Sequence, residues 1–328
     1  MKNYNIVFSI PIHEKFEVVV DQILNFFHFN PGCAIVFHIS QGFSYNKSFI
    51  TKNDFVDIIN EIGDVFINPE SVRTGYCDII QAHLSNFNYI KSVVDFDFFS
   101  MCASNEMFIK PGLYDSVKDY DCGLEFMDIN QNKYFNWYTG IQALKDEDLL
   151  RYIGIEGLDR FYGSHIEGSY YKKDLFGKIV DIIESFYDYK KMSYVYPREE
   201  IYFSTVTKAL ELKGEVMRIK ENGLFSWSRW NSFMALKVWC WDVYKQQNNP
   251  LTFSVKRVDR SKDANLRIFL RKKTGLYNDV VKYINSLKTK DYLSIFCSDS
   301  FDFFKESVLM LGRRVQYIIE KAQGLYKH

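Results

Sequence analysis

The feature that most constrains the fold is a regular alternation of short apolar runs and longer amphipathic stretches over the first hundred residues. The apolar runs are typical of strands buried on both faces, and the longer stretches place apolar side chains at helical spacing. The expected strands cover residues 5–11, 33–39, 65–68 and 98–104, and the expected helices cover 16–28, 52–62 and 75–93. This alternation predicts an α/β fold with right-handed crossovers and a mostly parallel, Rossmann-like sheet flanked by helices.

The remainder of the chain has a less regular pattern. Residues 111–170 are rich in loops, and further helices are expected over 174–188, 199–212, 277–287 and 301–322. Gly214 is placed to end the helix over 199–212. We therefore divide the chain into residues 1–214 and a C-terminal part, 215–328, that is helical toward its end. A single domain is the alternative.

Charge and cysteine content exclude several classes of protein. Lys+Arg and Asp+Glu both number 41, so no overall field favours nucleic acid, and any phosphate site must be a local cluster. The six cysteines are scattered without a Cys-x-x-Cys spacing, which indicates reduced thiols. The expected first strand leaves no room for a signal peptide, and no apolar run reaches the length of a membrane span. We expect a cytoplasmic protein.

Polar side chains follow the expected strands at the points where the strands end. His13, Ser40, Asn68 and the segment 103–106 all occupy such positions. Ligands of parallel α/β sheets bind beyond the carboxyl ends of the strands. The sequence therefore predicts a nucleotide-type crevice near His13 and Ser40.

Seven short segments carry a more specific signal. Two of them are Ala103-Ser-Asn-Glu-Met-Phe-Ile-Lys110 and Pro197-Arg-Glu-Glu-Ile-Tyr-Phe-Ser-Thr205, and the other five lie within 8–17, 33–40, 73–84, 163–175 and 249–272. In this order they resemble the core-2/I-branching family of glycosyltransferases, which includes β-1,6-N-acetylglucosaminyltransferases and peptide xylosyltransferases. The resemblance implies a GT-A-type fold, with residues 1–214 binding nucleotide sugar and acceptor and the C-terminal part completing the diphosphate site.

The resemblance also points to a catalytic carboxylate. Inverting transfer needs a base that deprotonates the acceptor hydroxyl as the anomeric carbon develops positive charge. The family motif places this base at Glu200, in the first turn of an expected helix. Glu199 is adjacent and could serve equally as the base, and it is also a candidate substrate contact. The helix dipole alone favours Glu at such positions.

Positive charge is required where the nucleoside diphosphate leaves. Branching enzymes of this family work without metal, so the resemblance implies that Arg271 and Lys272, with Arg257, contact the diphosphate. A solvated basic face is the alternative. The literal Asp95-Phe-Asp97 precedes the expected strand over 98–104, whereas a metal-binding pair belongs at a carboxyl end. We therefore expect no metal and no other cofactor.

The remaining candidates are contacts to the substrates. The resemblance implies that His13 and Ser40 contact the nucleotide, with Ser40 standing where the family carries an acidic residue. Asn105 and Glu106 close a central strand and would face the donor sugar or the acceptor. Trp137 could stack on a sugar, with core packing as the alternative.

Together these features predict an inverting, metal-independent glycosyltransferase that moves a sugar from a donor such as UDP-GlcNAc to a hydroxyl of a glycan or glycolipid acceptor. Bacterial capsule or lipopolysaccharide synthesis is the expected setting, with peripheral contact between the aromatic, basic C-terminal third and the inner membrane. A non-catalytic nucleotide- or glycan-binding module of the same fold is the alternative. A nucleotidyltransferase is disfavoured because the chain lacks a Gly-rich phosphate loop.

Overall fold

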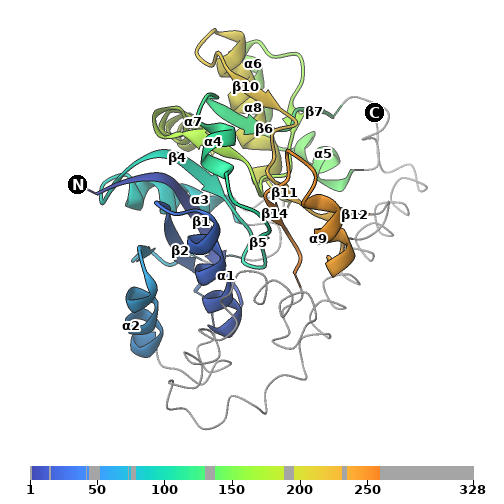
Figure 1. The fold of residues 1–328 in the computed structure, drawn as a ribbon. Helices are drawn as coiled ribbons and strands as arrows, with labels where there is room; N and C mark the ends of the chain where they lie inside the picture. The colour runs from blue at the N-terminus through green and yellow to red at the C-terminus, as the bar shows by residue number, and fades with distance from the viewer. Residues whose placement is uncertain are drawn as a thin grey trace, which may run out of the picture.

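The structure is a computed structural model that describes residues 2–14, 16–41, 43, 52–72, 74, 79–129, 137–187, 196–230 and 235–258 (Figure 1). The helices expected over 277–287 and 301–322 lie outside these residues, as do Arg271 and Lys272.

The centre of the fold is a seven-stranded sheet with the order β10-β6-β9-β4-β1-β2-β3. Its strands are β1 (Asn3–Ile12), β2 (Ala34–Ile39), β3 (Val65–Ile67), β4 (Asp95–Met101), β6 (Cys122–Leu124), β9 (Tyr170–Lys172) and β10 (Ile219–Glu221). Neighbouring strands pair in parallel except at β9, which is antiparallel to both β4 and β6. The expected α/β fold with a mostly parallel sheet is confirmed.

Helices cover both faces of this sheet because successive strand residues point to opposite sides. In β1, Phe8 belongs to an apolar cluster with α1 (Phe16–Phe29), whereas Val7 belongs to a cluster with α3 (Ile80–Ile90). Figure 1 shows α1 and α3 on opposite faces, with α2 (Lys52–Ile62) beside α1. The alternating side chains of β1 thus contribute to two apolar cores, one on each face of the sheet.

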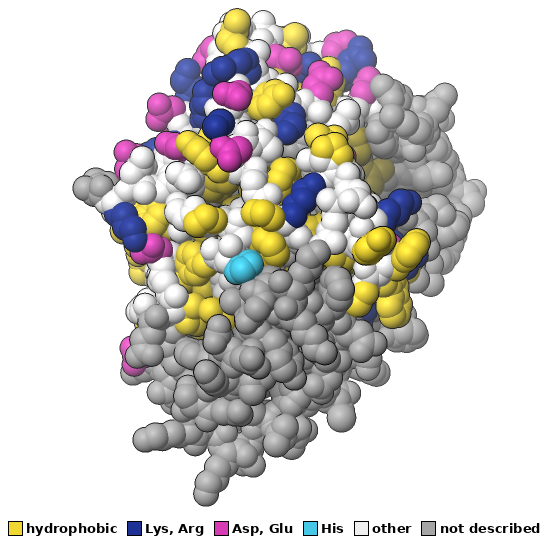
Figure 2. Space-filling view, in the orientation of Figure 1, with side chains coloured by type: hydrophobic (Ala, Val, Ile, Leu, Met, Phe, Trp, Pro, Cys, Tyr) yellow, Lys and Arg dark blue, Asp and Glu magenta, His cyan; other side chains and the backbone are white. Residues whose placement is uncertain are grey.

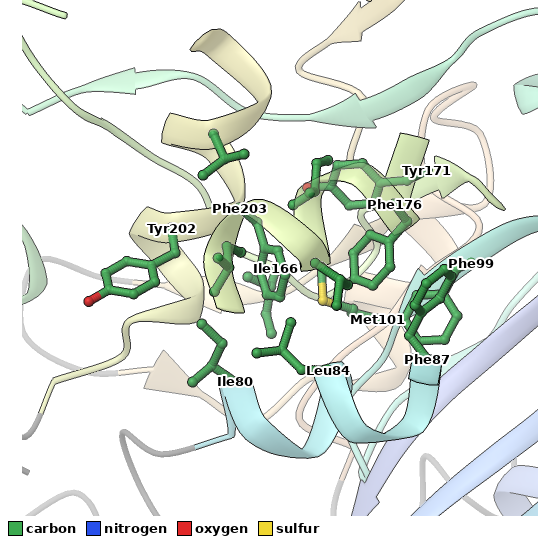
Figure 3. Packing of buried hydrophobic residues seen from close by; sticks show 14 of the residues in the cluster. Ile80, Leu84, Phe87, Phe99, Met101, Ile166, Tyr171, Phe176, Tyr202 and Phe203 are labelled. Atoms are coloured by element: carbon green, nitrogen blue, oxygen red, sulfur yellow. The ribbon is translucent and has the colours of Figure 1, made fainter. Parts of the chain in front are cut away.

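The core on the α3 face is rich in aromatic rings. The helices α7 (Lys173–Phe186) and α8 (Glu199–Leu212) pack there with α3, as Figure 3 shows. The Phe176 ring centroid lies 5.0 Å from that of Phe87 and 4.6 Å from that of Phe99. The aromatic side chains on this face of the sheet therefore serve mainly to pack the core.

A smaller sheet joins the segment beyond residue 214 to the first half of the chain. Its strands are β11 (Ser226–Trp227), β14 (Ser254–Val255) and β5 (Met107–Phe108), in that order. β14 lies antiparallel to β5, and β10 extends the main sheet next to β6. Residues 219–258 therefore add strands to sheets that begin before residue 214.

None of the helices in the described ranges combines the length and the apolar character needed to cross a membrane.

The start of α8 is held by a buried polar cluster around Asp146, the N-cap of α6 (Glu147–Glu156). The Asp146 carboxylate accepts hydrogen bonds from the hydroxyls of Tyr196 (2.6 Å) and Tyr202 (2.7 Å). It also accepts one from Arg198 Nε (3.2 Å), and the Asp146 and Arg198 side chains are only 5% and 8% exposed. One carboxylate therefore fixes the first turn of α8 relative to α6.

Replacing Asp146 with alanine should lower the free energy of unfolding by about 3–5 kcal/mol, because the buried Arg198 guanidinium loses its charged partner. Urea denaturation measures the change. The control is Asp159→Ala: Asp159 pairs with Arg160 at the surface, where its side chain is 74% exposed. That substitution should cost less than about 1 kcal/mol. Equal effects of the two substitutions would contradict the proposed role of Asp146.

Candidate functional site

The strand order of the main sheet changes direction between β1 and β4. The chain proceeds from β1 outward through β2 to β3, and then returns to place β4 on the other side of β1. Ligands of open α/β sheets bind in the crevice at this kind of switch point, outside the carboxyl ends of the strands. The loops that follow β1 and β4 at this switch point are joined, because the Ser104 hydroxyl donates to Glu14 Oε1 at 3.1 Å.

The structure places His13 and Ser40 at this edge of the sheet, as the sequence predicts. His13 directly follows β1 and is exposed, and Ser40 directly follows β2 and is buried. The Ser40 hydroxyl accepts a hydrogen bond from the Thr74 amide at 3.1 Å. Contact of either residue with a nucleotide stays a prediction.

Asn105 and Glu106 follow β4 but differ in orientation. Asn105 is partly exposed, and its backbone carbonyl accepts a hydrogen bond from the Val258 amide at 3.0 Å. Glu106 has no exposed surface, and its carboxylate accepts hydrogen bonds from the Ala103 amide (3.0 Å) and the Ser254 hydroxyl. Donors from its own loop and from β14 thus enclose the Glu106 carboxylate, and contact of Glu106 with a substrate stays a prediction.

Burial raises the pKa of Glu106 to about 7, although hydrogen bonds from Ser254 and the Ala103 amide act in the opposite direction. This carboxyl group therefore changes its protonation near neutral pH inside the protein. Because the pKa of Glu106 differs between the folded and unfolded chain, the free energy of unfolding depends on pH.

Glu200 lies in the first turn of α8, where its side chain is 18% exposed. Its Oε2 accepts a hydrogen bond from the Thr139 hydroxyl at 3.1 Å, and its Oε1 lies 3.6 Å from His165 Nδ1. The Glu200 backbone carbonyl accepts a hydrogen bond from the Ser164 amide at 2.7 Å. Glu199 is buried. Of the two glutamates, Glu200 thus has the more accessible carboxylate.

Sequence reasoning missed an ion pair between Glu167 and Lys256. The two side chains are 12% and 15% exposed. Burial raises the pKa of Glu167, but the Lys256 charge outweighs burial and lowers this pKa to about 2. Glu167 and Lys256 lie far apart in the sequence, so no local spacing pattern could have predicted this ion pair.

His165 connects this ion pair with Glu200. Burial lowers the pKa of His165, but the neighbouring Glu200 carboxylate outweighs burial and raises the pKa above its ordinary value, while Lys256 opposes it. The charge of Glu167 in turn acts on both His165 and Glu106. The structure therefore brings the loop after β4, the segment 164–168 and the start of α8 into one electrostatic neighbourhood.

Trp137 immediately precedes α5 (Tyr138–Ala143), the helix whose Thr139 donates a hydrogen bond to Glu200. Its ring packs against Gly163: a Cβ atom at that position would lie 2.3 Å from Trp137 Cζ3. A larger residue at 163 would therefore force the Trp137 ring to shift, and part of the ring is covered by backbone. Trp137 remains partly exposed, so its stacking on a sugar stays a prediction.

Asp95 and Asp97 lie at the amino end of β4, opposite to the crevice. They belong to the strand itself, which begins three residues earlier than the sequence predicts. Asp95 pairs with Lys173 at 2.7 Å, and Asp97 accepts a hydrogen bond from the Tyr114 hydroxyl at 2.6 Å. Within the described residues, His, Cys, Asp and Glu form no group of three or more that is suited to holding a metal ion.

Arg257 follows Lys256 and adopts a left-handed backbone conformation with φ of 69°. Its carbonyl accepts a hydrogen bond from the Val238 amide at 3.2 Å, and its side chain is partly exposed. Contact of Arg257 with a diphosphate stays a prediction.

Comparison with known proteins found similar solved structures, two of which are given below, and no sequence relative. No family model matches the chain, and no curated protein matches it significantly. The apo-form glycosyltransferase GlyE of Streptococcus pneumoniae is similar with a TM-score of 0.37 and 11% identity, over 86% of this chain and 62% of GlyE. A nucleoside-diphosphate-sugar pyrophosphorylase of Vibrio cholerae has a TM-score of 0.37 and 11% identity, over 66% of this chain and 91% of that protein. These values assign the chain to no family.

The stability of the wild type relative to Glu106→Gln should fall as pH rises from about 5 to about 8, by up to about 3 kcal/mol. Folding raises the pKa of this carboxyl from 4.5 to about 7, so the native state keeps a proton that the unfolded chain releases. Stability that is present below pH 4.5 is therefore lost as pH rises through 7.

Urea denaturation of both proteins at several pH values measures this effect. Glu221→Gln is the control, because Glu221 is exposed and its replacement should change stability equally at each pH. A difference between wild type and Glu106→Gln that does not vary with pH would show that Glu106 is not buried as described.

Proposed function

We propose that this chain is an inverting glycosyltransferase that transfers a sugar from a UDP-sugar such as UDP-GlcNAc to a hydroxyl of a glycan acceptor. The observation that carries the proposal is the position of Glu200: an accessible carboxylate in the first turn of α8, held by Thr139 and His165. The sheet supplies a switch-point crevice, and the seven ordered segments of the sequence supply the resemblance to glycosyltransferases.

In the proposed reaction, Glu200 accepts the proton of the acceptor hydroxyl as its oxygen bonds to the anomeric carbon. The bond between this carbon and the diphosphate breaks at the same time, and the leaving diphosphate carries the electron pair. The Thr139 hydroxyl binds Oε2 and thereby orients the carboxylate. The amino end of α8 favours the negative charge of Glu200 before the proton is transferred.

The donor would lie across the carboxyl ends of β1, β2 and β4. His13 and Ser40 would contact the nucleoside, and Asn105 the sugar, because they border the crevice. Lys256 is neutralised by Glu167, so we assign the diphosphate contacts to Arg257, Arg271 and Lys272 instead. In this scheme fixed cations take the place of a metal ion.

The proposed setting follows from the resemblance. It is a cytoplasmic step in the synthesis of a bacterial surface polysaccharide such as capsule or lipopolysaccharide, with a glycan or glycolipid as acceptor.

Glu200→Gln should reduce hydrolysis of UDP-GlcNAc, measured as UDP release, by about 10²–10⁴-fold, because the amide cannot accept the proton. Binding of UDP-GlcNAc, measured by ligand-observed NMR, should be retained. Glu215→Gln is the control, since Glu215 is an exposed glutamate beyond the opposite end of the same helix. Full activity of Glu200→Gln would show that Glu200 is not the base.

The same assay separates the enzyme from a non-catalytic binding module. A wild-type protein that binds UDP-sugars but releases no UDP, with or without glycan acceptors, would favour the binding module.

Treatment with EDTA should leave UDP release unchanged, because the proposed mechanism neutralises the diphosphate with basic side chains. Activity in EDTA is compared with activity after addition of Mn²⁺ or Mg²⁺. Strict dependence on either ion would contradict the cationic scheme.

A further inference from the structure

Helix α9 (Cys240–Gln246) presents large aromatic side chains to the solvent. Trp239, Trp241 and Tyr244, here called the α9 aromatic face, are 61%, 70% and 63% exposed. The rings of Trp241 and Tyr244 stack on each other with their centroids 6.2 Å apart. Figure 2 shows hydrophobic side chains gathered over α9, with Lys or Arg side chains beside them. Soluble proteins rarely expose so much adjoining aromatic surface without a partner.

The opposite side of α9 is firmly packed, so the outward direction of these rings is set by the fold. Val243 is fully buried in a cluster with Val238 and Val255. Asp242 is also buried, and its Oδ2 accepts a hydrogen bond from the Trp239 amide at 2.9 Å. The buried positions 242, 243 and 246 fix the rotation of the helix and leave 241 and 244 outside.

The segment that carries this face has a one-sided charge. Residues 223–258 contain five basic side chains and a single acidic one, Asp242. Asp242 points inward, with its carboxylate 3.8 Å from Arg229 Nε. Lys245 is exposed directly beside Tyr244, and Lys237 is partly exposed. A surface that approaches α9 therefore meets aromatic rings and positive charge, with no exposed carboxylate from residues 223–230 and 235–258.

We propose that the α9 aromatic face docks this protein on an anionic lipid surface. Trp and Tyr favour the headgroup region of a bilayer, and neighbouring Lys and Arg are attracted to anionic lipids. A protein partner would fit the aromatic rings but not the lysines, which are depleted in protein–protein interfaces. Docking through exposed side chains requires no spanning helix.

The docked orientation bears on the candidate site. The segment 254–258, which begins with β14, connects the α9 region with the loop after β4: the Val238 amide donates to the Arg257 carbonyl, and the Val258 amide donates to the Asn105 carbonyl. A lipid surface held at α9 would thus lie near the crevice, where a lipid-linked acceptor could reach it. This last step rests on the proposed function, whereas docking itself does not.

Flotation of the full-length protein with vesicles tests the proposal. Vesicles of phosphatidylcholine with about 30 mol% phosphatidylglycerol should bind the wild type, less strongly at high salt, and pure phosphatidylcholine should bind it weakly. Trp241→Ser/Tyr244→Ser should lower binding about tenfold or more. Lys245→Glu should lower binding to the anionic vesicles about fivefold, with little change on phosphatidylcholine.

The matched control is Leu212→Ser/Met217→Ser, which removes two other exposed apolar side chains, 66% and 78% exposed, outside the α9 aromatic face. It should bind vesicles like the wild type. All variants should melt like the wild type, because the substituted side chains are exposed. UDP release by Trp241→Ser/Tyr244→Ser in detergent-free buffer should be unchanged, which separates failure of docking from failure of the proposed enzyme.

Three results would overturn the proposal. The first is a wild type that does not bind anionic vesicles. The second is equal binding by the wild type and Trp241→Ser/Tyr244→Ser. The third is a wild type that self-associates but does not bind vesicles, combined with a double variant that no longer self-associates. This result would show that a second copy of the chain occupies the α9 aromatic face.

Discussion

The largely buried ion pair between Glu167 and Lys256 joins the parts of the chain on which the candidate site depends. Glu167 belongs to the segment that also carries His165, and Lys256 follows the strand that encloses Glu106. Next to the pair, Gly168 has φ of 85°, and a Cβ atom there would lie 2.3 Å from the Ser226 amide nitrogen. The close approach of the backbone at Gly168 to Ser226 and the Glu167–Lys256 ion pair thus join the same two parts of the chain. Removing one partner of such a pair is costly, because it leaves the other charge buried alone.

Around this pair the site combines a fixed scaffold with one accessible carboxylate. Asp146 holds the first turn of α8 through Arg198 and two tyrosine hydroxyls, while Thr139 and His165 act on the Glu200 side chain itself. Glu106, by contrast, is enclosed and ties β4 to β14. Two of the three glutamates that the sequence placed near a substrate therefore differ in their surroundings: the Glu106 carboxylate is enclosed by the scaffold, and Glu200 is the group we assign to the chemistry.

The sequence predicts the parts of the fold that follow from local periodicity. Apolar runs identified β1 and β2, and helical spacing identified α1, α7 and α8, which places Glu200 in a first helical turn. The antiparallel direction of β9 and the burial of Glu106 could not be predicted in this way. Both arise from partners distant in sequence: β9 pairs with β4 and β6, and Glu106 meets Ser254. The ion pair between Glu167 and Lys256 could not be predicted for the same reason, because its partners are distant in sequence.

A crystal structure of the protein bound to UDP-GlcNAc tests the central claim most directly. The account predicts that the nucleotide lies in the crevice outside the carboxyl ends of β1 and β4, with the anomeric carbon of the sugar on the side that faces Glu200. A nucleotide bound elsewhere, or a sugar whose anomeric carbon is turned away from Glu200 and screened from it, would contradict the account.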